Sequence, residues 1–323
     1  MPANLTPQYR AAEASFKGAR NLEEKRTALE EMLATIPKHK GTEKMQADLK
    51  RRLARLRQEV EVRSGRGGNV IRVEPEGVAQ LVLLGPPNTG KSSLVAALTR
   101  AEPPIADYPF TTTRPQPGMM PYEDVQIQLV DLPPVAREHM PPWLPNVVQG
   151  ADMGLLLMDP TSREVPEDVE VVRERLAAVR IPLVGELPED ADPRDSPLPT
   201  LGVVAKSDLS RTEDVEVLRD LYGNVFPLVT ISTVTREGLE ALKVSVWKQL
   251  QLVRVYAKPP GKPVDRSAPF VLPLGATVLD LAERIHGEIA QRLQFARVWG
   301  GQVDGNRVSR DFELRDRDVV ELH

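Results

Sequence analysis

Residues 85–93 read GPPNTGKSS, and this stretch decides the fold that the chain of 323 residues is expected to adopt. It satisfies the pattern G-x-x-x-x-G-K-[ST], directly after the apolar run VAQLVLLG and directly before SSLVAALTR. In such a loop the glycines let backbone N–H groups surround phosphates, the lysine reaches the β- and γ-phosphates, and the hydroxyl binds Mg²⁺. A chance glycine-rich turn would lack this strand–loop–helix context. The stretch therefore predicts a phosphate-binding loop that comprises Gly85, Pro86, Pro87, Asn88, Thr89, Gly90, Lys91, Ser92 and Ser93.

The segments after this loop alternate between strand and helix patterns. VQIQLVDL, MGLLLMDP, TLGVVAKSDL and FPLVTIST are typical of strands, and PEDVEVVRERLAAVR and EGLEALKVSVWKQLQLV are typical of helices. Such alternation predicts a mostly parallel sheet with helices on both faces. We therefore expect an α/β domain at residues 76–256, with an acidic, proline-rich exposed loop at 186–200.

Two further domains are expected on either side of it. Residues 1–66 predict a helical hairpin, because leucines recur at helical spacing on both sides of PKHKGT. Its second helix contains KRRLARLR, which is either a solvated face beside a leucine seam or a phosphate-binding face for RNA. Residues 257–323 predict a small α+β domain of short strands, with one helix over TVLDLAERIHGEIAQRL.

The composition excludes several classes of protein. The net charge of −4 argues against a general nucleic-acid coat, and the absence of cysteine excludes disulfides, iron–sulfur clusters and thiolate zinc sites. The four histidines are scattered and make no metal-ligand pattern. There is no apolar run of about 18 residues and no signal-peptide core, so we expect no membrane association and a cytoplasmic protein. A leucine seam can pair within or between chains, so a monomer or a weak oligomer is expected.

AKSD at 205–208 points to the base of a nucleotide. Asp208 could accept hydrogen bonds from the ring N–H and exocyclic amine of guanine, and Lys206 could lie along the base plane. Backbone amides near Ser232 and Thr233, in the later run IST, could meet the guanine oxygen. The alternatives are a plain strand-end turn, or an ATP site in which Asp208 is coincidental; competition between GTP and ATP separates the last of these.

With these motifs the chain resembles the Obg and developmentally regulated GTP-binding family of GTPases. The likeness rests on the phosphate loop, IADYPFTT at 105–112, DLP at 131–133, KSD at 206–208 and QLVRVYAKPPGK at 251–262. The C-terminal region resembles a TGS domain, the ubiquitin-like β-grasp module, through LPLGATVLDLAERIH, ARVWG and DRDVVELH. The resemblance spans nearly the whole chain. Unlike eukaryotic members, this chain is expected to have no second large domain between Asp131 and Ala205.

The resemblance implies a Mg²⁺-dependent GTPase that binds GTP and GDP. By motif, Lys91 and Thr112 would be catalytic, and Thr112 would close on Mg²⁺ and the γ-phosphate. Ser92 would bind Mg²⁺ directly and Asp131 through water. Asn88 matches an asparagine that supports K⁺ in potassium-dependent relatives, although it is equally a turn residue. The TGS likeness implies association with the ribosome or RNA, through that domain and the basic helix; the alternative is a protein-docking module.

The chain departs from the family pattern at three positions, and Pro134 and Ala205 among them predict a weakened GTPase. The family's D-x-P-G is DLPP here, and Pro134 has no backbone N–H to offer the γ-phosphate. Val135 lies where many GTPases place a water-positioning glutamine, which relatives in this family also lack. Ala205 replaces the asparagine of N-K-x-D, which should weaken guanine binding while Asp208 preserves selectivity. His139 is not favoured as a general base. The alternative is a degenerate GTPase that acts as a nucleotide-bound docking scaffold with little or no turnover.

Overall fold

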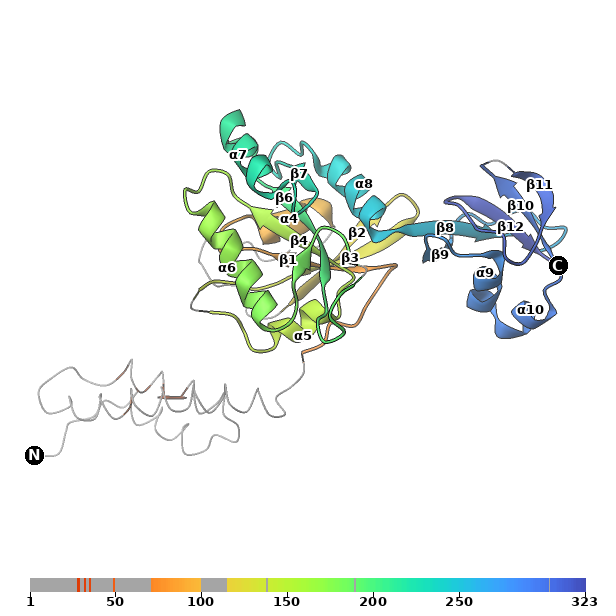
Figure 1. Cartoon of the computed structure of the whole chain (residues 1–323), viewed down its shortest axis with the longest axis horizontal. Coiled ribbons are helices and arrows are strands. Elements are labelled where there is room, and N and C mark those ends of the chain that lie inside the picture. Colours follow the sequence, from red (N-terminus) through yellow and green to blue (C-terminus); the bar gives the residue numbers. More distant parts are fainter. Residues whose placement is uncertain are drawn as a thin grey trace, which may run out of the picture. The chain divides into compact units, whose positions relative to one another are not determined.

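The computed structural model describes residues 71–99, 115–137, 139–188, 190–301 and 303–323, and a few helical positions nearer the N-terminus. Those positions are Ala28, Leu29, Met32, Thr35 and Leu49. The hairpin expected at 1–66, its basic run and Thr112 otherwise lie outside the described residues. Residues 72–323 form one compact unit, which contains two sheets (Figure 1).

The first sheet has seven strands in the order β2-β3-β1-β4-β6-β5, and β7 pairs with the end of β6. All neighbours are parallel except β2 and β3, which form a hairpin. This confirms the mostly parallel sheet. The strands are β1 (Gln80–Leu84), β2 (Gln116–Tyr122), β3 (Val125–Asp131), β4 (Met153–Met158), β5 (Leu183–Val184), β6 (Leu198–Val204) and β7 (Leu228–Thr230).

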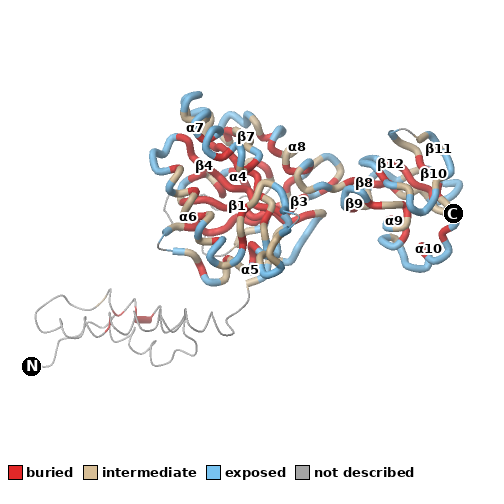
Figure 2. Tube along the Cα trace, in the orientation of Figure 1, coloured by how far each residue is buried: buried red, intermediate tan, exposed pale blue. Residues whose placement is uncertain are grey.

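The central strands are buried on both faces, as their continuous apolar runs predict. Every residue of β1 and β4 is buried. Leu81 and Leu83 share one core with α4 and α8, and the alternate residues Val82 and Leu84 point to the opposite face. Figure 2 shows the buried trace through both sheets. The helices around the first sheet are α4 (Lys91–Leu98), α5 (Leu144–Gln149), α6 (Val165–Ala178), α7 (Thr212–Tyr222) and α8 (Leu239–Leu250).

The second sheet has five strands in the order β11-β10-β12-β8-β9, parallel only between β12 and β8. Its strands are β8 (Leu252–Ala257), β9 (Phe270–Pro273), β10 (Ala296–Gly300), β11 (Val303–Val308) and β12 (Asp318–Leu322). Because β8 lies in this sheet, we propose that the C-terminal domain begins near Leu252, a few residues before the boundary expected from the sequence.

The prediction of a single helix over 277–293 is wrong in one respect, because the structure contains two helices there. They are α9 (Val278–Ile285) and α10 (Gly287–Arg292). His286 between them is extended, with φ −170 and ψ 134. At the start of α9, Thr277 and Asp280 form a capping box, which satisfies backbone donors of the first turn.

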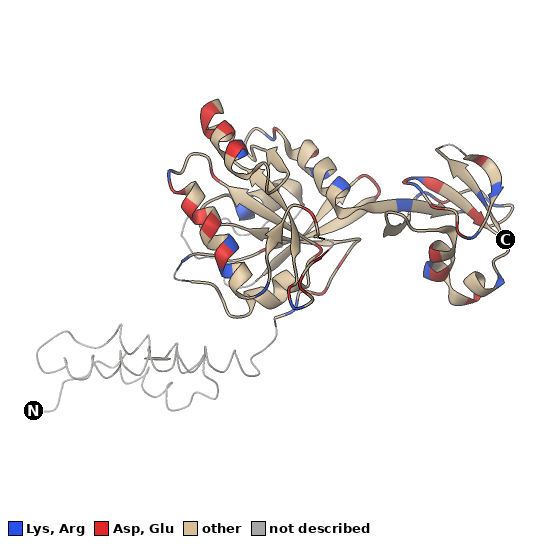
Figure 3. Cartoon of the chain, viewed as in Figure 1, with Lys and Arg blue, Asp and Glu red and all other residues tan. Residues whose placement is uncertain are grey.

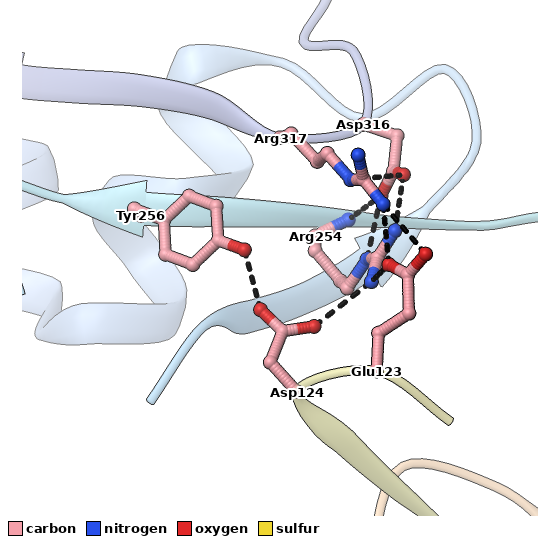
Figure 4. A network of polar contacts seen from close by, with 6 residues as sticks. All are labelled: Glu123, Asp124, Arg254, Tyr256, Asp316 and Arg317. Atoms are coloured by element: carbon pink, nitrogen blue, oxygen red, sulfur yellow. Dashed lines mark hydrogen bonds and ion pairs between the residues drawn. The ribbon is translucent and has the colours of Figure 1, made fainter. Parts of the chain in front are cut away.

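One buried arginine joins the two sheets (Figure 4). Arg254 on β8 is 2% exposed, and its guanidinium lies 4.9 Å from the ring centre of Trp247 on α8. It donates to Asp124 over 2.8 Å and to Glu123, both in the β2–β3 turn. It also donates to Asp316, which precedes β12, over 2.6 and 3.0 Å. Arg254 therefore ties the β2–β3 hairpin of the first sheet to the second sheet.

Candidate functional site

The predicted phosphate loop runs from the end of β1 to the start of α4. Gly85 and Gly90 have φ of 144 and 94, a region that only glycine adopts without strain. A Cβ on Gly85 would lie 2.8 Å from the carbonyl oxygen of Leu157. The N-terminus of α4, which begins at Lys91, adds the positive end of a helix dipole. Local geometry here matches the requirements of a loop that wraps around phosphates.

Lys91 is held against the same loop. It is 7% exposed, and its Nζ donates to the carbonyl oxygens of Gly85 over 3.0 Å and Pro86 over 2.7 Å. Burial lowers the pKa of Lys91 to about 8, although the charge of Asp131 opposes this shift. A bound phosphate would favour the charged form of this amine, since opposite charges stabilise each other.

Ser92 and Asp131 form a pair beside the loop. The Ser92 hydroxyl donates to Oδ2 of Asp131 over 2.5 Å. The other oxygen of Asp131, Oδ1, is buried and has no hydrogen-bond partner among the described residues. Burial raises the pKa of Asp131, against the hydrogen bond from Ser92 and the charge of Lys91.

This pair fits Mg²⁺. A hydroxyl, a carboxylate and an unpartnered carboxylate oxygen are hard oxygen ligands of the kind Mg²⁺ prefers. No group of three or more acidic, histidine or cysteine side chains that could hold a metal occurs in the described part of the chain. Mg²⁺ commonly keeps several waters and takes further ligands from phosphates.

The DLPP segment after β3 packs beneath the phosphate loop. All residues from Asp131 to Val135 are buried. Pro134 has no N–H, and the N–H of Val135 donates to the carbonyl oxygen of Gly85 over 3.4 Å. The first backbone donor after the two prolines therefore contacts the loop itself. Residues 132–143 contain no helix at the described positions, and α5 begins at Leu144 with Pro145 in its first turn, where no N–H is needed.

The residues expected at the base come together from two loops. Oδ1 of Asp208 accepts a hydrogen bond of 2.6 Å from the hydroxyl of Ser232, which is fully buried. The Ser232 hydroxyl in turn accepts from the N–H groups of Val234 and Thr235. Since β6 and β7 are parallel neighbours, the loops that follow them lie at the same edge of the sheet. Asp208 is thus held with one carboxylate oxygen fixed.

Asn88, which was expected at the site, and His139, which was not favoured, lie apart from these contacts. Asn88 is exposed at the tip of the phosphate loop with φ 63, as a turn residue would be. His139 is exposed and forms a backbone bridge with Ala136. Neither has a side-chain hydrogen bond to the other site residues within the described ranges. Thr112 lies outside those ranges.

The sequence reasoning missed one site residue, Asp159. It follows β4 and is 9% exposed. Its Oδ2 accepts from Nζ of Lys206 over 2.5 Å. Nearby, Ala205 packs in the apolar core and its N–H donates to the carbonyl oxygen of Met158. The sequence signal that could have found it is the aspartate of DPT at 159–161, directly after a buried strand. Proteins with parallel sheets bind ligands at the ends of such strands.

A phosphate-loop motif between β1 and α4 at the edge of a mostly parallel sheet, with Ser92 and Asp131 beside it, is the arrangement of P-loop GTP-binding proteins. Residues 80–184 match the family model described as 50S ribosome-binding GTPase, and residues 253–323 match the TGS domain. An uncharacterized GTP-binding protein of Halobacterium salinarum is 30% identical over 93% of this chain and 98% of its own. Developmentally-regulated GTP-binding protein 1 of Xenopus laevis is 27% identical over 91% and 96%. The chain belongs to the family of developmentally regulated GTP-binding proteins, as its motifs predicted.

A solved structure supports the fold. The crystal structure of a GTP binding protein from Pyrococcus horikoshii aligns with a TM-score of 0.52 and 17% identity, covering 76% of this chain and 99% of that one. Together with the two family models, this confirms the α/β GTPase domain followed by a TGS domain. None of the described helices is long and apolar enough to cross a membrane.

Proposed function

We propose that this GTP-binding protein is a Mg²⁺-dependent GTPase with slow hydrolysis of its own, and that it acts in the cytoplasm on RNA or the ribosome. The observation that carries the first part is the convergence of the loops after β3, β1, β4, β6 and β7 at one edge of the sheet. Neighbouring parallel strands end at the same edge, which is where α/β proteins bind ligands.

Each group at this edge has a proposed role. The phosphate loop and Lys91 bind the β- and γ-phosphates, and Ser92 and Asp131 hold Mg²⁺, with Thr112 as a further ligand. Bound Mg²⁺ would neutralise charge that develops on the phosphates. Asp208 binds the guanine N–H and amine with its second oxygen. The N–H of Thr233, which has no partner among the described residues, faces the guanine oxygen in this assignment. A supporting role of K⁺ at Asn88 is tested by turnover with and without potassium.

Slow hydrolysis follows from the DLPP segment. Pro134 removes one γ-phosphate donor, and the next N–H, of Val135, is bound to Gly85. His139, the histidine of this segment, is exposed on a turn. The missing donor at Pro134 and the bonded N–H of Val135 also favour the alternative function, a nucleotide-bound docking scaffold without useful turnover.

Replacing Pro134 with glycine is expected to increase the preference for GTP over GDP by about 10-fold or more. The substitution supplies a backbone N–H, and one hydrogen bond to a charged group contributes about 1.5–3 kcal/mol. Calorimetry with a non-hydrolysable GTP analogue and GDP measures the ratio, and single-turnover kinetics measure hydrolysis. Pro133→Gly is the matched control, since it loosens the same segment without adding a donor at position 134. An unchanged ratio in Pro134→Gly would contradict this account of the switch.

Aromatic and cationic side chains on the TGS sheet favour RNA as the partner, although the same strands carry Glu321, which pairs with Lys258. Nζ of Lys258 lies 4.4 Å from the ring centre of Trp299, and the guanidinium of Arg307 lies 3.8 Å from that of Phe295. The rings of Phe295 and His323 stack at 4.7 Å. Aromatic and cationic side chains in this arrangement are suited to unstacked bases and phosphates. Figure 3 shows largely acidic colouring of α6 and α7 in the GTPase domain and both acidic and basic colouring on the TGS sheet.

Neutralising Arg297 and Arg307 is expected to weaken binding of ribosomal RNA and to flatten its salt dependence. These arginines lie opposite each other on β10 and β11 and are exposed. For each phosphate that is no longer neutralised, the slope of log affinity against log salt becomes shallower by about 0.7–0.9. Titration of the full chain from low to high salt measures the slope, and Arg219→Gln on α7 is the control. If the slope changes only when the basic run at 50–57 is neutralised, the sheet face does not bind the RNA.

A further inference from the structure

Asp159 occupies a central position at the nucleotide edge. The strand order places β4 between β1, which leads to the phosphate loop, and β6, which leads to the base loop. Met158 at the end of β4 pairs with Val204, so Asp159 and Lys206 leave adjacent strands at the same level. A side chain at position 159 therefore lies between the two halves of the site.

Thr161 holds one oxygen of the Asp159 carboxylate, and Lys206 contacts the other. Its Oδ1 accepts hydrogen bonds from the N–H of Thr161 over 2.9 Å and from the Thr161 hydroxyl over 2.6 Å. This leaves Oδ2 to accept from Nζ of Lys206 over 2.5 Å. Burial opposes ionisation of Asp159, but the bonds from Lys206 and Thr161 outweigh it and hold its pKa below the ordinary value. Asp159 is therefore the anionic partner of Lys206 in this pair, and Thr161 holds its other oxygen.

Lys206 has a demanding conformation that this pair stabilises. Its backbone is left-handed, with φ 55, which a lysine adopts at a cost. Its side chain is 32% exposed, so burial alone does not hold it in one rotamer. Ala205 before it contributes only a methyl group to the apolar core. Within the described residues, Asp159 supplies the one ion pair recorded for the Lys206 side chain.

We propose that Asp159 is a positioning residue that holds Lys206 along the guanine plane. The inference rests on the proposed assignment of Lys206 to the guanine site. A lysine ordered in advance loses less side-chain freedom when the nucleotide binds. Because Asp159 acts on the base and not on the terminal phosphate, GTP and GDP benefit equally.

Asp159→Asn tests this directly. An asparagine oxygen can still accept from Thr161, but its NH₂ group then faces Lys206 and offers it no acceptor. We expect GTP and GDP affinities to fall together by about 10-fold, the order of a lost charge-assisted hydrogen bond. Isothermal calorimetry on the full chain with Mg²⁺ measures both. Asp192→Asn is the control, because Asp192 pairs with Arg194 in an exposed loop away from the site.

A double-variant cycle separates positioning from a structural role. In a Lys206→Met background, Asp159→Asn should cause no further loss of affinity, because the two act through one contact. Lys206→Arg keeps a cation opposite Asp159 and leaves Asp159 and its turn unchanged. This variant should retain most of the affinity that Lys206→Met loses. This pair of variants also serves if Asp159→Asn fails to fold.

Three other results would overturn the inference, and they have different consequences for the proposed guanine site. Wild-type affinity in Asp159→Asn with a loss in Lys206→Met refutes the role of Asp159 and leaves the guanine site standing. An equal loss from Asp159→Asn in both backgrounds shows that Asp159 does not act through Lys206. Wild-type affinity in Lys206→Met removes Lys206 from the proposed guanine site, and the inference falls with it.

Discussion

Replacing Arg254 with methionine is expected to lower the free energy of unfolding by about 3 kcal/mol, the lower end of the range for breaking a buried ion pair. The guanidinium is 2% exposed and faces Glu123, Asp124 and Asp316. Without it, three carboxylates remain at one junction, and Arg317, which contacts Glu123 there, is 59% exposed and therefore compensates them only in part. The loss is at the lower end because those carboxylates keep 23–42% of their side-chain surface in water. Urea unfolding at pH 7 measures the change.

The pH dependence of this loss follows from the carboxylates. Hydrogen bonds from Arg254 lead the causes that lower the pKa of Glu123. For Asp316, burial opposes ionisation, but bonds from Arg254 outweigh it and lower the pKa. Groups whose folded pKa is depressed stabilise the fold above their unfolded pKa, and this stabilisation is lost as pH falls through the folded value. The difference between wild type and Arg254→Met should therefore be complete at neutral pH and shrink below about pH 4.

Two further variants serve as controls in this experiment. Arg180→Met removes an exposed partner of Asp195 and should change stability by less than about 1 kcal/mol. Adding Asp316→Asn to Arg254→Met should restore part of the loss, because it removes one uncompensated carboxylate. If Arg254→Met unfolds at the wild-type urea concentration, the network in Figure 4 contributes nothing to stability.

Replacing Asp208 with asparagine is expected to lower GTP affinity by at least about 100-fold, since two hydrogen bonds to a charged acceptor are lost or weakened. The asparagine oxygen can still accept from the Ser232 hydroxyl, which directs the NH₂ group to the base. Guanine presents an N–H and an amine there, so donor would face donor. Xanthine has a carbonyl oxygen in place of the amine, and binding of xanthosine triphosphate should rise.

Competition binding with GTP, ATP and xanthosine triphosphate measures this exchange. Asp220→Asn on α7 is the matched control, because it removes one exposed carboxylate elsewhere in the same domain. If Asp208→Asn leaves the ratio of GTP to ATP affinity unchanged, Asp208 does not read the base, and an ATP site becomes the better interpretation.

The parts of the site that were foreseen are those built from a few consecutive residues. The phosphate loop needs glycines at set places between a strand and a helix, and all of those requirements lie within residues 80–98. The proximity of Asp208 to Ser232 was also foreseen, because the carboxyl ends of neighbouring parallel strands meet at one edge. The break at His286 was missed, since the helical pattern of apolar residues continues across it.

Asp159 and Arg254 show what could not be foreseen. The partner of Asp159 is 47 residues away, and the Asp124 partner of Arg254 is 130 residues away. In the sequence, Asp159 is one acid after a strand, and Arg254 is one polar residue in an alternating run. Nothing in either local pattern says which of the many opposite charges in the chain will lie within reach.

Short stretches of sequence were sufficient to predict the phosphate loop, to propose Asp208 as the residue that recognises the base, to note that Pro134 lacks an N–H and to give the order of GTPase and TGS domains. These depend on the chemistry and spacing of adjacent residues, which local patterns report, whereas the order of the strands came from the structure. Only the tertiary structure shows that Val135 donates to the phosphate loop, that Asp159 pairs with Lys206 and that Arg254 joins the two sheets. Each of these is an interaction through space, and its energy depends on distance and burial that exist only once the sheets have formed.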